Sequence, residues 1–104
     1  MKIIIAKVKV QEGKESEFES VALDLAKQVE ANEPGNKLYN LCKSDVGEYF
    51  FVEMYDGDEA IAAHRSAAHL REAGSKFAAV MAGGPEITIL DVITDENGSA
   101  LSRS

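Results

Sequence analysis

Four short runs of strand-forming residues, separated by two stretches with helical spacing, constrain the fold of this chain more than any other feature. The runs cover residues 2–10, 38–44, 48–55 and 86–93 and are rich in β-branched and aromatic side chains. The stretch between the first two runs repeats its apolar residues along one helix face: Phe18, Val21, Ala22, Leu25, Ala26 and Val29. The expected order is strand, helix, strand, strand, helix, strand.

The second helical stretch is expected in two pieces, over residues 60–65 and 68–81. Asp56 is placed to cap the start of the first piece, and Glu59 follows three residues later. The second piece carries its apolar residues on or near one face. We therefore expect two consecutive helices between the third and fourth strands.

Turn residues separate the elements and set their order in space. Pro34-Gly35 ends the first helix, and residues 45–47 join the two middle strands into a hairpin. The order then matches a split β-α-β arrangement, an α+β fold with a four-stranded antiparallel sheet and the helices on one face.

The length of 104 residues supports one domain. We expect this domain to span residues 1–94. Residues 95–104 have too little apolar content to pack, and they are expected to form a flexible polar tail.

The sheet has more apolar surface than one layer of helices can cover. In the third strand, Phe50, Val52 and Met54 alternate with residues of the opposite face, which include Phe51 and Glu53. Two helical segments cover only one face, so the other needs a second partner. The simplest partner is a second copy of the chain, packed sheet to sheet. We expect a homodimer with a joint, barrel-like core.

Charge and composition disfavour several classes of partner. Eleven Lys and Arg against eighteen Asp and Glu give a net charge of −7, which repels nucleic acids and anionic membrane surfaces. No apolar run is long enough to span a membrane, and Lys7 and Lys9 interrupt any signal-peptide core. Cys42 is the only cysteine, so a reducing, cytoplasmic location is expected and a structural metal site is not.

Two polar residues in the apolar strands are candidates for catalysis. Asn40 and Glu53 each lie within a strand, where a polar group is costly unless it is paired or used. Burial among aromatic residues should raise the pKa of Glu53, which suits a group that exchanges protons near neutral pH. Alternatively, Glu53 pairs with a Lys, Arg or His and only fixes one element to another.

His64 and His69 are the only histidines, and they stand five residues apart at the junction of the two later helical pieces. This spacing is weak support for a metal site, and none is expected. His64 fits a partly buried structural role, whereas His69 could face a pocket between helix and sheet.

Aromatic and sulfur-containing side chains would form the core or, around a remaining pocket, bind a flat aromatic ligand. The candidate substrate-binding residues are Tyr39, Phe51, Tyr55, His64, Phe77 and Met81.

Several segments together resemble the antibiotic biosynthesis monooxygenase (ABM) domain family, over about residues 2–93. The first is Glu33-Pro34-Gly35-Asn36, followed by Leu38-Tyr39-x-Leu41. The second is Phe50-x-x-Glu53-x-Tyr55-x-x-x-Glu59-Ala60-x-x-Ala63-His64-x-x-x-x-His69, followed by Met81-x-Gly83-x-Pro85.

The resemblance implies a ferredoxin-like fold, a dimeric α/β barrel, and a small pocket in each subunit. It also implies oxidation of an aromatic or quinol substrate by O₂ without any cofactor, through deprotonation of the substrate to an electron-rich anion. In that scheme Glu53 or His69 acts as the base, and Asn40 or Tyr39 positions a substrate oxygen.

Other branches of the same family leave alternatives open. One branch degrades the phosphorylated autoinducer-2 signal, a small phospho-ketone; the cations available for its phosphate are Lys37, Lys43, Arg65 and Arg71. Haem-degrading relatives use an Asn, Trp and His set, which disfavours that activity because this chain has no Trp. A third alternative is a non-catalytic dimer that binds a small molecule.

Overall fold

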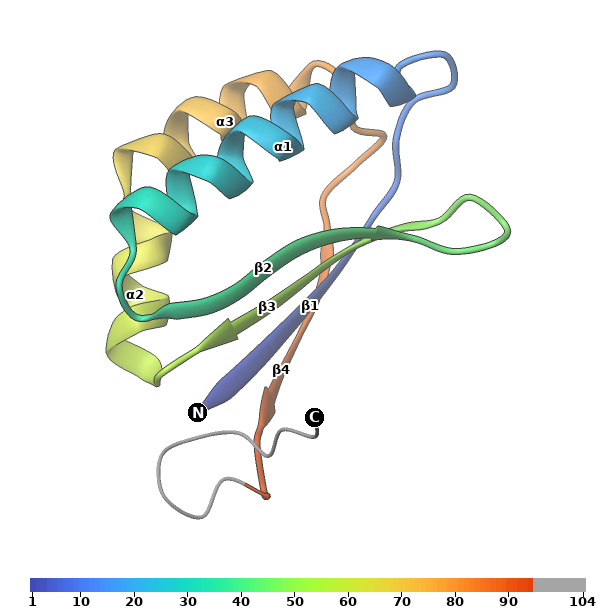
Figure 1. Ribbon diagram of the computed structural model, residues 1–104. Coiled ribbons are helices and arrows are strands. Elements are labelled where there is room, and N and C mark those ends of the chain that lie inside the picture. The colour runs from blue at the N-terminus through green and yellow to red at the C-terminus, as the bar shows by residue number, and fades with distance from the viewer. Residues whose placement is uncertain (95–104) are drawn as a thin grey trace.

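Three helices cover one face of a four-stranded antiparallel sheet in the computed structural model, which describes residues 1–94 (Figure 1). The predicted tail, residues 95–104, lies outside the described residues. The elements are β1 (Lys2–Val8), α1 (Glu15–Asn32), β2 (Asn36–Lys43), β3 (Tyr49–Tyr55), α2 (Asp58–Ser66), α3 (Ala68–Ala78) and β4 (Glu86–Asp91).

The strands lie in the order β2-β3-β1-β4, and every pair of neighbours is antiparallel. This topology confirms the predicted split β-α-β arrangement and the ferredoxin-like fold. Among the described residues, no helix is both long enough and apolar enough to cross a membrane.

β1 and α3 end earlier than the sequence pattern predicts. β1 stops at Val8, and Val10 forms only an isolated bridge with Met81. The backbone of Gln11 donates to the Val80 carbonyl over 2.8 Å, so the chain after β1 is tied to the segment after α3. These hydrogen bonds end both elements, because the same backbone groups cannot also serve a longer strand or helix.

The predicted cap of α2 is wrong. The residue before the helix is Gly57, and no side chain caps the helix N-terminus. Asp56 instead pairs with Lys37 over 3.7 Å, while its backbone N–H donates to the Gly35 carbonyl over 2.9 Å. The start of α2 is therefore fixed by the strand that precedes it and by the α1–β2 connection.

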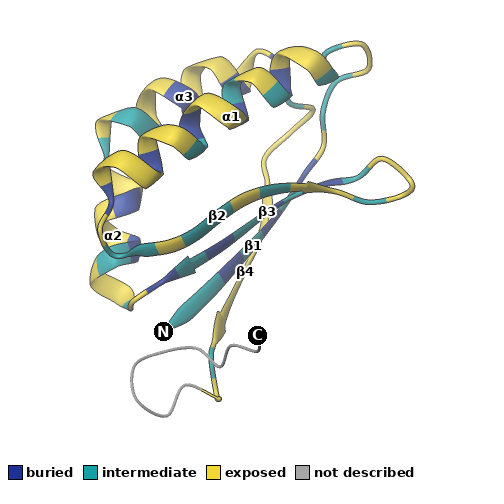
Figure 2. Ribbon diagram, viewed as in Figure 1, coloured by how far each residue is buried: buried dark blue, intermediate teal, exposed yellow. Residues whose placement is uncertain are grey.

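The core lies between the helices and the face of the sheet that they cover. α1 contributes four buried residues, Phe18, Ala22, Leu25 and Val29, which are the centre of the predicted stripe. Buried residues alternate with half-exposed ones along β1 and β3, as Figure 2 shows. The alternation predicted for residues 50–55 is confirmed.

The other face of the sheet is apolar and is not covered by any described residue. Ile5 pairs with Val52, and Ile3 pairs with Met54 and Leu90, so these side chains gather on that face. They remain partly accessible, and every residue of β4 is exposed (Figure 2).

We therefore keep the homodimer as a prediction. Light scattering should give twice the 11.2 kDa of one chain at micromolar concentration. Val52→Asp should produce a monomer, because a charge in a buried sheet interface is not solvated. The matched control is Leu23→Asp, on an exposed position of α1, which should keep the dimer. A wild-type mass of one chain contradicts the argument from the uncovered face.

The connection between α1 and β2 passes very close to α2. A Cβ on Gly35 would lie 2.6 Å from the Cβ of Ala60, well inside the contact distance of two carbon atoms. Glycine at this position allows the end of α1, the start of β2 and α2 to converge.

Gly35→Ala should lower the free energy of unfolding by about 1–3 kcal/mol, because the added methyl group overpacks the contact with α2. Urea denaturation measures the change. The control is Gly74→Ala in α3, where no atom lies within 4 Å of the added Cβ. That change should stabilise the helix by about 0.5–1 kcal/mol. Equal effects of the two substitutions would contradict the close approach.

Candidate active site

The main cavity lies between the helix-facing side of the sheet and α3, with a volume of about 600 Å³. Most of its wall is apolar, and its polar lining residues are few: Tyr39, Glu53, His64 and Arg65. An apolar cavity with a small set of converging polar groups is the usual form of a small-molecule site.

Glu53 is buried on the helix-facing side of β3 and is 5% exposed. The hydroxyl of Tyr55, two residues along the same strand face, donates to its carboxylate over 2.6 Å. Burial raises the pKa of the Glu53 carboxyl above its usual range, while the Tyr55 hydroxyl and the nearby His64 ring oppose the rise. Glu53 therefore holds a proton more readily than an exposed glutamate.

His64 is held between two tyrosine rings. The ring centroids of Tyr39 and Tyr55 each lie 5.5 Å from that of His64. Burial raises the pKa of both tyrosine hydroxyls, so they remain neutral hydrogen-bond donors. The packing leaves His64 only 6% exposed and fixes the direction of its two ring nitrogens.

The Nδ1 atom of His64 faces the carboxylate of Glu33, at 3.0 Å from Oε1 and 2.9 Å from Oε2. Its Nε2 atom faces Glu53 and lies 3.8 Å from that carboxylate, beyond hydrogen-bond distance. A carboxylate can only accept, so the hydrogen of a neutral His64 ring is on Nδ1. Nε2 is then free to accept a proton.

Glu33 is the residue that sequence reasoning missed. It follows the last residue of α1, where its backbone N–H donates to the Val29 carbonyl over 2.9 Å, and Pro34 stops the helix. Its side chain is 6% exposed, and its Oε2 atom also lies 2.5 Å from Nε2 of His69. The one signal was its place in the Glu33-Pro34-Gly35-Asn36 segment, which the sequence analysis used for the family resemblance and the helix end but not for the site.

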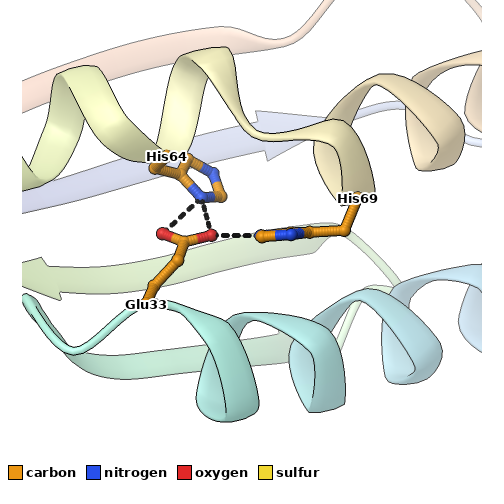
Figure 3. A group of neighbouring side chains, drawn as sticks. All are labelled: Glu33, His64 and His69. Carbon is orange, nitrogen blue, oxygen red and sulfur yellow. Dashed lines mark hydrogen bonds and ion pairs between the residues drawn. The ribbon is translucent and has the colours of Figure 1, made fainter.

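Three helices therefore meet at one carboxylate, as Figure 3 shows: Glu33 ends α1, His64 belongs to α2, and His69 lies in the first turn of α3. The ligating atoms of these three side chains lie within 4.8 Å of one another. Two imidazoles and a carboxylate also form a set that could hold a metal ion.

The structure brings most of the predicted site residues together. Those that line the main cavity are Tyr39, Phe51, Glu53, His64, Phe77 and Met81. Tyr55 is fully buried behind Glu53. His69 faces a second pocket instead, which it lines together with Glu33.

Asn40 does not join the predicted site. Its neighbour across the sheet is Val52, so it stands on the face that the helices do not cover, and it is exposed. Tyr39, the next residue along β2, pairs with Glu53 and faces the cavity. The register of β2 against β3 therefore separates the two adjacent candidates onto opposite faces.

The fold and the site together define a ferredoxin-like domain with an apolar cavity and a buried His–carboxylate pair. The sequence matches the family model named antibiotic biosynthesis monooxygenase (ABM) over residues 1–76. A solved structure from Caulobacter crescentus, named a "putative antibiotic biosynthesis monooxygenase", is 39% identical. The match covers 88% of this chain and 89% of that one, with a TM-score of 0.85. The chain belongs to the ABM family, which confirms the resemblance seen in the sequence.

More distant solved structures share the fold. A protein of the same name from Nitrosomonas europaea is 24% identical, with a TM-score of 0.82 over 89% of this chain and 99% of that one. Another, from Deinococcus radiodurans, is 17% identical, with a TM-score of 0.79 over 100% and 99% of the two chains. No curated protein matches the sequence.

Glu53→Gln should stabilise the protein increasingly as the pH rises. The unfolded chain ionises near the ordinary value of 4.5, whereas burial holds the folded-state pKa above it. The folded protein is thus penalised as the pH rises through that window, and the neutral glutamine is not. Urea unfolding of both proteins between about pH 4 and 8 tests this. The exposed Glu72→Gln serves as the control, and a difference for Glu53→Gln that stays constant with pH contradicts the prediction.

Proposed function

We propose that this chain is a monooxygenase that uses O₂ to oxidise a small, flat aromatic or quinol-type substrate and needs no cofactor. One observation carries the proposal: an apolar cavity of about 600 Å³ that has a buried carboxylate–imidazole pair at its polar end. Such a cavity suits a substrate with an aromatic body and one acidic hydroxyl or enolisable carbonyl.

His64 is the base in this proposal. Glu33 holds the hydrogen on Nδ1, so Nε2, which faces the polar end of the cavity, takes the substrate proton. The negative charge of Glu33 then stabilises the imidazolium, as a carboxylate does for the histidine of a catalytic triad. His69, the other histidine that the sequence analysis offered as a base, lines the second pocket and not this cavity.

Glu53 and Tyr39 are the partners for the substrate oxygen. Burial raises the pKa of both groups, so each is able to donate a hydrogen bond to a developing oxyanion. Tyr55 holds Glu53 in place through its hydroxyl. Their positions on neighbouring strands point both groups into the same end of the cavity.

The oxidation then follows from the anion itself. For an anthrone, the deprotonated carbon gives one electron to O₂, and the radical pair combines to a peroxide bound to that carbon. The peroxide takes a proton back from His64 and loses water, which leaves a carbonyl group. One oxygen atom enters the product and the other leaves as water. The mostly apolar wall offers few polar groups that would hold water beside the radical pair.

A phospho-ketone isomerase is the second candidate, and Arg65 is the observation that favours it. Of the four cations that the sequence offers for a phosphate, Arg65 is the one that lines the main cavity. A non-catalytic binding dimer would need the cavity, but it would not need the Glu33–His64 pair that prepares a base.

Oxygen uptake by metal-stripped protein tests the proposal, with anthrone and a panel of quinols as substrates and autoxidation subtracted. Uptake should saturate with substrate and need no added cofactor. His64→Gln should lower kcat/KM by about 10²–10⁴-fold, the usual contribution of a general base. Glu53→Gln should lower kcat, whereas Glu72→Gln on the exposed side of α3 should match the wild type.

Circular dichroism of each variant separates loss of chemistry from loss of fold. Unchanged uptake in both His64→Gln and Glu53→Gln defeats the assigned roles. If no substrate gives uptake above background, conversion of phosphorylated pentanones, reduced by Arg65→Gln, would support the isomerase instead.

A further inference from the structure

We propose that Glu33, His64 and His69 together bind a divalent transition-metal ion, and that the bound ion prevents His64 from acting as a base. The metal site stands on these three side chains alone. The effect on the base rests on the function proposed above.

The three side chains form a recognisable ligand set. Two imidazole nitrogens and a carboxylate are the donors that Zn²⁺, Co²⁺ and Fe²⁺ accept in proteins, whereas Mg²⁺ and Ca²⁺ prefer oxygen alone. Here Nδ1 of His64 and Nε2 of His69 both point at the Glu33 carboxylate (Figure 3). All the ligating atoms already lie within 4.8 Å of one another.

Only a small movement would open the cluster for an ion. The ring nitrogens lie 2.9 and 2.5 Å from Oε2 of Glu33. Donors held at 2.0–2.2 Å around a tetrahedral Zn²⁺ stand about 3.3 Å apart. Each of these nitrogen–oxygen separations would have to lengthen by less than about 1 Å. Glu33 follows the last residue of α1, so its side chain adjusts without a change inside the helix.

An ion would reach the three side chains through a second pocket, and this pocket also leaves one coordination position open to water. Glu33 and His69 line this pocket, which has a volume of about 600 Å³ and lies apart from the residues of the main cavity. Its wall also carries three further acidic residues: Asp56, Asp58 and Glu59. Their negative field raises the local concentration of cations, and the pocket leaves room for water on the ion.

The other ring nitrogen of His64 faces a carboxylate as well. Metal-bound histidines commonly donate their second N–H to a carboxylate, which orients the ring and strengthens the ligand. Nε2 of His64 lies 3.8 Å from Oε1 of Glu53, a separation that a small ring movement closes. Glu53 is therefore in position to support His64 as a ligand.

His64 cannot hold the ion and act as the base at the same time. An ion on Nδ1 displaces the hydrogen from that atom, and a neutral ring then carries its hydrogen on Nε2. Nε2 no longer has a lone pair for the substrate proton. The ion would thus act as a reversible inhibitor that approaches from the second pocket.

Titration of metal-stripped protein with Co²⁺ tests the site without any substrate. We expect one ion per chain and the visible absorption of Co²⁺ bound to nitrogen and oxygen. His69→Ala and His64→Gln should each weaken binding by more than the roughly 10–100-fold that loss of an outer-shell partner costs. Because these are the only histidines, no other imidazole can replace them.

Two controls separate this site from weaker ones. Cys42→Ser removes the single thiol, which is exposed on the uncovered face of the sheet, and should leave the spectrum unchanged. Glu72→Gln removes one exposed carboxylate of α3, which does not line the second pocket, and should keep one ion per chain. Circular dichroism checks that each variant is folded.

The outcomes distinguish this proposal from the proposed function. Absorption that persists in both histidine variants, or that disappears with Cys42→Ser, overturns the metal site. Co²⁺ that binds without lowering oxygen uptake overturns the exclusion at His64. Co²⁺ binding by a protein that shows no oxygen uptake supports the metal site and defeats the monooxygenase. Inhibition that a chelator reverses supports both parts.

Discussion

The site depends on the contacts of the buried Glu33 carboxylate with His64 and His69. The Glu33 side chain is 6% exposed, so its carboxylate has lost most of its water and protein donors must replace that water. His64 and His69 supply them, and they belong to two different helices. One buried group therefore fixes the end of α1 against both α2 and α3. Without it, two imidazoles would lose their partners, which costs more than the hydrogen bonds alone contribute.

The break between α2 and α3 explains why the cavity has one polar end. α2 and α3 are separated by Ala67, whose extended backbone interrupts the helix, and each piece takes its own direction over the sheet (Figure 1). His64 ends up beside Glu53 of β3, while Phe77 of α3 contributes to the apolar wall. A substrate bound there would meet polar groups only at one end, which fixes its orientation.

Local pattern predicted much of this molecule. The alternation of residues 50–55 placed Glu53 on one face with Phe51 and Tyr55, and the structure confirms it. The same argument could not decide between Asn40 and Tyr39, because alternation does not say which face of β2 meets the helices. That choice belongs to the register of β2 against β3, which shifts between Asn36 and Leu38.

The sequence by itself determined the order of the elements, the ABM family and the presence of polar groups in apolar strands, because each depends on short-range spacing. Only the tertiary structure decided that Glu33 joins the site and that His64, not His69, faces the cavity. Glu33 stands 31 and 36 positions from the two histidines. Contacts at that separation depend on how three helices pack over the sheet, which helical and strand periodicity do not encode.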